Sequence, residues 1–146
     1  MKKSTTKPFM PAPDYGRSLE AFTVNLLSTD LERALVFQRD VLQADILHAD
    51  EDLLIVQGFG SSWMVHADHT YDQHPLLTDT QAHSRRGAGV ELRLHHADPD
   101  AITARALEHG FTVLDGPRDQ PDHGLREAHL LDADGYVWVP DSALSD

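Results

Sequence analysis

Alternating apolar and polar positions open the body of the chain and predict a strand, a helix and three more strands. The run 21–30, AFTVNLLSTD, alternates as a half-buried strand does. At its end Thr29 and Glu32 have capping-box spacing, which predicts that a helix begins there. Apolar residues at helical spacing then indicate one buried helix face: Leu31, Ala34, Leu35, Val41 and Leu42. Three short strands follow at about 46–48, 53–57 and 62–67, with Gly58 and Gly60 in the last turn.

The same order returns after residues 70–87, a polar stretch without periodicity that is too long for a simple hairpin. GVELRLHHA alternates as a strand, Asp98 suits a helix N-cap, and Pro99 suits the first helical position. Gly110 suits the left-handed residue that ends such a helix. The runs FTVL, LREAHLL and YVWVP then predict three strands, with DADG as the last turn.

Two strand-to-helix corners repeat at one offset: Asp30 and Asp98 lie 68 residues apart, as do Thr23 and Glu91. We therefore predict an α+β fold made of two β-α-β-β-β modules, whose helices cover one face of a curved mixed sheet while the other face surrounds a cavity. Module one covers about 19–69, the connection about 70–87 and module two about 88–140, within a single domain at 19–146. A two-layer sandwich with ferredoxin-like halves is the structural alternative.

Composition and charge narrow the class of protein. The 146 residues are 40% hydrophobic, without a run that could cross a bilayer, and the polar, proline-broken residues 1–18 look like a flexible arm without a secretory signal. We therefore expect a soluble, cytoplasmic protein. There is no cysteine, which excludes disulfides and thiolate metal sites. The net charge is −12 and the three lysines all lie in the arm, so we expect neither nucleic acid nor membrane as a partner.

These segments resemble the vicinal oxygen chelate (VOC) superfamily, which includes glyoxalase I, extradiol dioxygenases, and fosfomycin- and bleomycin-resistance proteins. NLLSTDLERALVFQRDVLQAD resembles its first strand and helix, and DADGYVWV its closing turn and last strand. DQPDHGLREAHLLDADG is most similar to the bleomycin-resistance branch. The resemblance covers about 19–140 and implies the glyoxalase/bleomycin resistance/dihydroxybiphenyl dioxygenase fold, a small-molecule ligand and a homodimer.

The resemblance also implies a divalent metal, such as nickel, zinc, iron or manganese, held by four side chains. Carried over position by position, those ligands fall on Thr23, His66, Glu91 and Val139. Valine cannot coordinate a metal and threonine is a poor ligand, so His66 and Glu91 alone are competent, and two ligands rarely hold a catalytic ion. We therefore expect no metal cofactor. The alternatives are a displaced site using His66, Glu91, Glu127 and His129, or a zinc site in the run HADHTYDQH.

Strand alternation predicts which side chains line the cavity, because alternate residues share a face. If Thr23 and Glu91 face the cavity, then Asn25, Arg93, Val137 and Val139 do too, while Tyr136 and Trp138 face the helices. The resemblance to fosfomycin-resistance proteins places Glu127 and His129 on the cavity side and Arg126 away. The complete expected ligand-binding lining adds the fourth strand: Thr23, Asn25, Met64, His66, Glu91, Arg93, Val137 and Val139, with Glu127 and His129 as the acid–base pair. His95 is a candidate for the cavity rim.

Three readings of this lining stay open. The charged groups can pair only with each other, since a buried charge needs a partner, and Glu91–Arg93 or Arg93–Glu127 contacts are then expected. They can also bind a small polar or cationic molecule in an acidic cavity without metal, which is our leading hypothesis, with Arg93 on a carboxylate or carbonyl. The alternative is a metal-dependent VOC enzyme, a lyase, isomerase or dioxygenase-like catalyst with a displaced site, so the sequence leaves open whether the chain is an enzyme.

Overall fold

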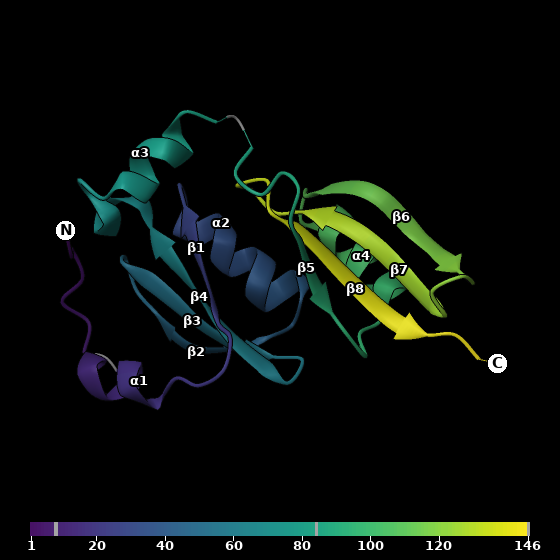
Figure 1. Cartoon of the computed structure of the whole chain (residues 1–146), viewed down its shortest axis with the longest axis horizontal. Coiled ribbons are helices and arrows are strands. Elements are labelled where there is room, and N and C mark those ends of the chain that lie inside the picture. Colours follow the sequence, from purple (N-terminus) through teal and green to yellow (C-terminus); the bar gives the residue numbers. More distant parts are fainter. Residues whose placement is uncertain (8, 84, 146) are drawn as a thin grey trace.

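The computed structural model describes residues 1–7, 9–83 and 85–145, and it contains two four-stranded sheets (Figure 1). Pro8 in the arm, Ser84 in the connection and Asp146 at the end of the predicted domain lie outside the described residues. Each sheet belongs to one of the two predicted modules. Their strand orders, β1-β4-β3-β2 and β5-β8-β7-β6, are the same arrangement repeated, with a parallel pair followed by antiparallel pairs.

Module one consists of six elements in chain order. They are β1 (Val24–Ser28), α2 (Leu31–Val36) with its π-helical continuation η1 (Phe37–Val41), β2 (Asp45–Ala49), β3 (Leu53–Gly58) and β4 (Ser61–Ala67). Module two follows the same order with β5 (Glu91–Leu94), α4 (Pro99–Glu108), β6 (Thr112–Gln120), β7 (Leu125–Leu131) and β8 (Val137–Ala143). The duplicated β-α-β-β-β architecture is therefore confirmed.

The helix boundaries follow the predicted signals at one corner and differ at the other. Asp98 caps α4 through the backbone N–H of Ala101, and Gly110 ends it with a φ of 79°. The capping box at Thr29 is wrong. Asp30 is the N-cap of α2 and accepts from the N–H groups of Glu32 and Arg33, whereas the Thr29 hydroxyl donates to Asp134 of module two. The Asp30 carboxylate therefore caps the helix, and the Thr29 hydroxyl is available for a hydrogen bond between the two modules.

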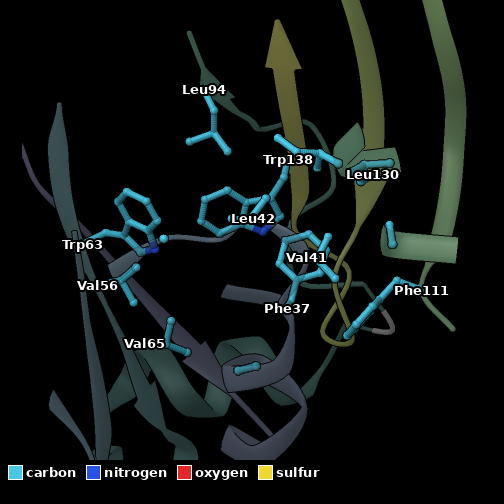
Figure 2. Packing of buried hydrophobic residues seen from close by; sticks show 14 of the residues in the cluster. Phe37, Val41, Leu42, Val56, Trp63, Val65, Leu94, Phe111, Leu130 and Trp138 are labelled. Carbon is cyan, nitrogen blue, oxygen red and sulfur yellow. The ribbon is translucent and has the colours of Figure 1, made fainter. Parts of the chain in front are cut away.

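One apolar core is formed by residues of the two sheets, of α2 with η1, and of α4 (Figure 2). Trp63 of β4 and Trp138 of β8 point toward one another, with their ring centroids 5.6 Å apart, and Phe37 packs 5.9 Å from Trp138. Trp63 Nε1 is satisfied in this core by Gln38 Oε1 at 3.0 Å. Both sheets therefore turn their apolar faces to the shared core, and each polar face lies on the far side of its own sheet.

Residues outside the modules carry more structure than the sequence indicates. The arm contains α1 (Ala12–Ser18), and its Lys3 and Ser4 backbone N–H groups donate to the Asp52 carboxylate. These contacts hold the arm along the first sheet (Figure 1). The connection contains the 3-10 turn η2 (Asp68–Tyr71) and α3 (Pro75–Gln81), where the sequence predicts no element. The flexibility of the arm stays a prediction. Across the described residues no helix has both the length and the apolar character that a membrane crossing requires.

The turn between β7 and β8 joins the two modules. Asp134 accepts hydrogen bonds from the Ser28 hydroxyl at 2.6 Å, the Thr29 hydroxyl at 2.8 Å and the Thr29 N–H at 2.9 Å. The Tyr136 hydroxyl donates to the Leu27 carbonyl at 2.9 Å. Asp132 supports the turn from inside, because it accepts from Trp138 Nε1 at 2.9 Å and from two backbone N–H groups.

Asp132 should make the stability of the fold depend on pH. Burial raises the pKa of its carboxyl from 3.8 to about 6, against the opposing effect of the hydrogen bond from Trp138. The folded state therefore holds a proton on Asp132 that the unfolded chain has released, so the contribution of Asp132 to the free energy of unfolding should fall as pH rises from about 4 to about 6. The full effect is at most on the order of 3 kcal/mol.

Urea unfolding of the wild type and of Asp132→Asn at several pH values checks this expectation. The substitution removes the titrating proton, so the free energy of unfolding of the wild type should fall relative to that of the variant as pH rises from 4 to 6. Parallel stability profiles for the two proteins would show that Asp132 does not titrate in this interval.

Candidate functional site

The register of the second sheet brings most of the predicted polar residues onto one face. Glu91 and Arg93 of β5 lie beside Val137 and Val139 of β8. On the other side of β8, Glu127 of β7 pairs with Asp141. Trp138 points from the opposite side of β8 into the core, and Arg126 bonds to Asp100 of α4, so the alternation assigns these two faces correctly.

Arg93 is at the centre of this face. Its guanidinium Nη1 donates to Glu91 Oε2 at 3.0 Å, and its Nη2 donates to Glu127 Oε2 and, at 3.1 Å, to Asp141 Oδ2. Glu127 and Asp141 are buried, with exposed fractions of 5% and 1%. Burial alone would lower the pKa of Arg93, but the hydrogen bonds that Arg93 donates to these three carboxylates outweigh burial and raise that pKa further above its ordinary value. Arg93 is therefore a permanent cation that is paired with two buried carboxyl groups.

Two histidines complete the charge-paired cluster, which we define as Glu91, Arg93, His95, Glu127, His129 and Asp141. His129 Nε2 lies 2.8 Å from Glu91 Oε1, and this bond, aided by Arg93, holds the pKa of Glu91 below its usual range. His95 Nδ1 lies 2.9 Å from Asp141 Oδ1. Three carboxylates of the cluster share one guanidinium, so its acidic groups outnumber its arginine by two.

Asp141 is the member of the cluster that the sequence prediction missed. A signal for it exists in the sequence, because Asp141 follows Val137 and Val139 at the same parity, but the predicted strand YVWVP ends at Pro140. β8 in fact continues to Ala143. Proline lacks an N–H, and Pro140 pairs with Leu94 at the very end of β5. The missing N–H therefore does not interrupt the strand, and the next residue, Asp141, places a buried carboxylate in it.

The remaining predicted lining residues lie elsewhere. Asn25, Met64 and His66 are on the first sheet, where Asn25 pairs with Met64 and Leu27 with His66. Met64 faces a cavity of about 240 Å³ under the arm, together with Leu53, Phe9 and Tyr15. His66 Nε2 is buried without a hydrogen-bond partner among the described residues, and burial lowers the pKa of this imidazole. The expectation of one common wall is thus wrong for a single chain, because the two sheets face each other through their apolar sides.

A groove between the sheets links the charge-paired cluster to the first module. It has a volume of about 290 Å³ and borders the edge strands β1 and β5, where Thr23 approaches Glu91 and Arg93. Aromatic side chains form much of its wall, and two serines of module one add hydroxyl groups. The complete lining is Phe22, Thr23, Val24, Phe59, Ser61, Ser62, Trp63, Glu91, Leu92, Arg93, Leu94, His95 and Trp138. Of the predicted lining, the groove therefore unites Thr23, Glu91 and Arg93.

The family model for the Glyoxalase/Bleomycin resistance protein/Dioxygenase superfamily matches residues 21–139. The chain belongs to this superfamily. Solved structures of similar fold include a glyoxalase-related enzyme from Fulvimarina pelagi, at 17% identity and a TM-score of 0.66, covering 84% of this chain and 87% of that one. A glyoxalase/bleomycin resistance protein/dioxygenase family enzyme from Burkholderia phytofirmans PsJN has 19% identity and a TM-score of 0.66, covering 84% and 97%. A comparison with the curated proteins finds no match.

TioX from Micromonospora sp. ML1 is a further structural neighbour, at 20% identity and a TM-score of 0.61, covering 86% of this chain and 99% of that one. At such identities the likeness establishes the shared fold. It leaves the branch of the superfamily and the ligand to be argued from this chain's own residues.

The residues at the superfamily's metal positions do not fit a metal within one chain. Val139 is fully buried and has no donor atom, and Thr23 offers a hydroxyl. His66 lies on the first sheet and Glu91 on the second, so the two competent ligands stand on separate polar faces. Among the described residues no three His, Asp or Glu side chains are arranged to hold an ion. The chemistry of the site is therefore derived from its own side chains.

Arg93 should be worth far more to the fold than an exposed arginine in an ion pair. Arg93→Gln leaves Glu127 and Asp141 buried without a counter-charge and should cost about 3–5 kcal/mol of unfolding free energy at pH 7. Arg39→Gln is the matched control: Arg39 pairs with Asp40 at the surface, so its loss should change the free energy of unfolding little. Equal losses for the two variants at pH 7 would contradict the central role of Arg93.

Proposed function

We propose that this protein binds a small organic cation with an apolar body in the groove between the two sheets, without a metal centre. The observation that carries the proposal is the excess of acid at Arg93: three carboxylates share one guanidinium. A cation can approach the cluster at Glu91, because its side chain is the most exposed of the three carboxylates, at 47%. There it would be attracted by the excess of acidic groups.

The state of Arg93 also argues against an anionic ligand. Three of the five N–H groups of its guanidinium already donate to carboxylates, so a ligand carboxylate must either approach the remaining two beside three like charges or displace Glu91, Glu127 or Asp141. Displacing either of the last two would leave a buried carboxylate unpaired, at a cost of several kcal/mol. We therefore propose a cationic ligand in place of the expectation that Arg93 meets a carboxylate or carbonyl of the ligand.

The volume of the groove and its lining residues indicate how large the apolar part of the ligand is and what it contacts. Its volume of about 290 Å³ is near the lower end for small-molecule sites and suits a ligand with one ring and a short substituent. Phe59, Trp63 and Trp138 supply apolar contact, while Ser61 and Ser62 supply hydroxyl groups. Cations are attracted to aromatic faces as well as to carboxylates, so Phe22 at the mouth adds to the preference.

Three probes with one benzyl or phenyl body and different charges test the proposal: benzyltrimethylammonium, benzyl alcohol and benzoate. The chain contains two tryptophans, and both line the groove, so their fluorescence reports binding directly. We expect the cation to bind most tightly and benzoate most weakly. Glu91→Gln should weaken the cation by roughly 3- to 10-fold, as expected for about 1 kcal/mol of screened attraction.

Glu108→Gln, at the exposed end of α4, is the control of equal charge change and should leave the affinity unaltered. Benzoate binding as tightly as the cation would overturn the proposed ligand class. An alternative that requires metal is tested in the same assay. Dialysis against a chelator should leave the affinity for benzyltrimethylammonium unchanged, whereas its loss and recovery with nickel, zinc, iron or manganese would favour a displaced metal site.

A homodimer, a cytoplasmic location and membership of the bleomycin-resistance-like branch remain expectations from the sequence. The segment of this chain at the position where that branch carries a drug-stacking tryptophan is Asp122–His123. A flat drug would lack its stacking surface there. The proposed ligand is therefore defined by the groove and not by the branch.

A further inference from the structure

We propose that His95 and Asp141 form an acid–base dyad that gives the groove a proton-transfer activity, with His95 Nε2 as the general base and Asp141 as its positioning residue. This inference rests on the proposed ligand groove, because the proton donor is a molecule bound there. It differs from the pair expected from the sequence, Glu127 and His129. Glu127 is buried against Arg93, and His129 is bonded to Glu91 through Nε2.

The hydrogen bond to Asp141 fixes which nitrogen of His95 carries the proton. A carboxylate can only accept, so Nδ1, at 2.9 Å from one oxygen and 3.0 Å from the other, must be the protonated nitrogen of the neutral ring. Nε2 then carries a lone pair. In the part of the chain that the structure describes, no hydrogen bond engages Nε2, and the imidazole is 64% exposed on the wall of the groove.

The backbone holds this ring in place through the same strand. β5 ends at Leu94, and His96 then adopts a left-handed φ of 56°, a conformation that non-glycine residues adopt at a cost. The turn lets the N–H of Ala97 donate to the carbonyl of Asp141 at 2.9 Å. Asp141 therefore accepts a hydrogen bond on each side of the turn: its side chain accepts from His95, and its backbone carbonyl accepts from Ala97.

The charges around the dyad suit an imidazole that gains a proton. Asp141, at 1% exposed, stabilises the imidazolium directly, and Glu127 and Glu91 lie beyond it on the same face. Arg93 is the opposing charge, but it is bonded to all three carboxylates. Among the described residues that line the groove, those of module one carry no charge, as with Phe59, Ser61 and Ser62. A proton taken from the ligand thus moves toward net negative charge.

The proposed step conserves atoms and electrons without a co-reactant. His95 Nε2 takes a proton from an acidic C–H or O–H of the bound molecule, whose bonding electron pair stays on the ligand. The imidazolium then returns the proton to another atom of the ligand or releases it to water. The substrate class is a small neutral or cationic molecule with one acidified proton.

5-Nitrobenzisoxazole is a suitable probe, because its ring opening needs only a base. The proton on its C3 passes to His95 Nε2, the C–H electrons form the nitrile, the N–O bond breaks, and a coloured phenolate leaves. The probe is flat, neutral and small enough for a groove of about 290 Å³. We expect a saturable rate that benzyltrimethylammonium inhibits and that falls at least roughly tenfold in His95→Gln, since positioned bases contribute roughly 10²–10⁴-fold.

His83→Gln is the matched control. The His83 side chain is 63% exposed, as open as that of His95, but it lies outside the groove and only approaches Asp79 at 3.9 Å. This variant should retain the full rate. Asp141→Asn should lower kcat with little change in KM, and nitrogen NMR should show that the Nδ1–H form of His95 no longer dominates. A purely structural Asp141 would not move either readout.

Each alternative result decides the matter. An undiminished rate in His95→Gln, or a rate lost in Glu91→Gln instead, overturns His95 as the base. Binding of benzyltrimethylammonium without any ring opening also overturns the dyad while leaving the proposed ligand groove intact. Absence of both binding and turnover would overturn the proposed ligand groove and, because it rests on that groove, the proposed dyad.

Discussion

The contact between Trp63 and Trp138 is the constraint on which the rest of this structure depends. Their centroids lie 5.6 Å apart, with Phe37 beside them, so the two modules bury their apolar faces against each other and against both helices. Large aromatic side chains dominate the free energy of such a core. Once the apolar faces meet, each polar face must lie on the far side of its sheet, and the edges of β1 and β5 border a groove. The position of the candidate site therefore follows from core packing.

The polar face of the second sheet contains charged groups that are shielded from water. Glu127 and Asp141 are buried, and their ion pairs with Arg93 compensate for the lost hydration. Such a cluster seldom raises stability above that of an apolar equivalent, since desolvation offsets most of the attraction. Its value lies in what it presents to the groove: an exposed Glu91, an oriented His95 and an excess of negative charge. Ligand preference and proton transfer would both come from this single arrangement.

Much of the fold could be predicted from the sequence because local rules decide it. Asp98 and Gly110 mark the ends of α4, and alternation assigns Arg93 and Trp138 to opposite faces. The contacts of Arg93 with Glu91 and Glu127 were expected from the need to pair buried charge. The common wall with Asn25 and His66 could not be predicted correctly, because alternation defines the faces of each sheet but not how two sheets pack. Asp141 was missed because a proline inside a strand resembles its end.

The most direct test of the central contact is far-ultraviolet circular dichroism of the chain, which contains two tryptophans. Indoles 5.6 Å apart and tilted by 48° couple their transitions and should give a pair of bands of opposite sign. The account predicts that this couplet is present in the wild type and disappears in both Trp63→Phe and Trp138→Phe, while the remaining spectrum is unchanged. A wild-type spectrum without the couplet would contradict the shared core and, with it, the placement of the groove.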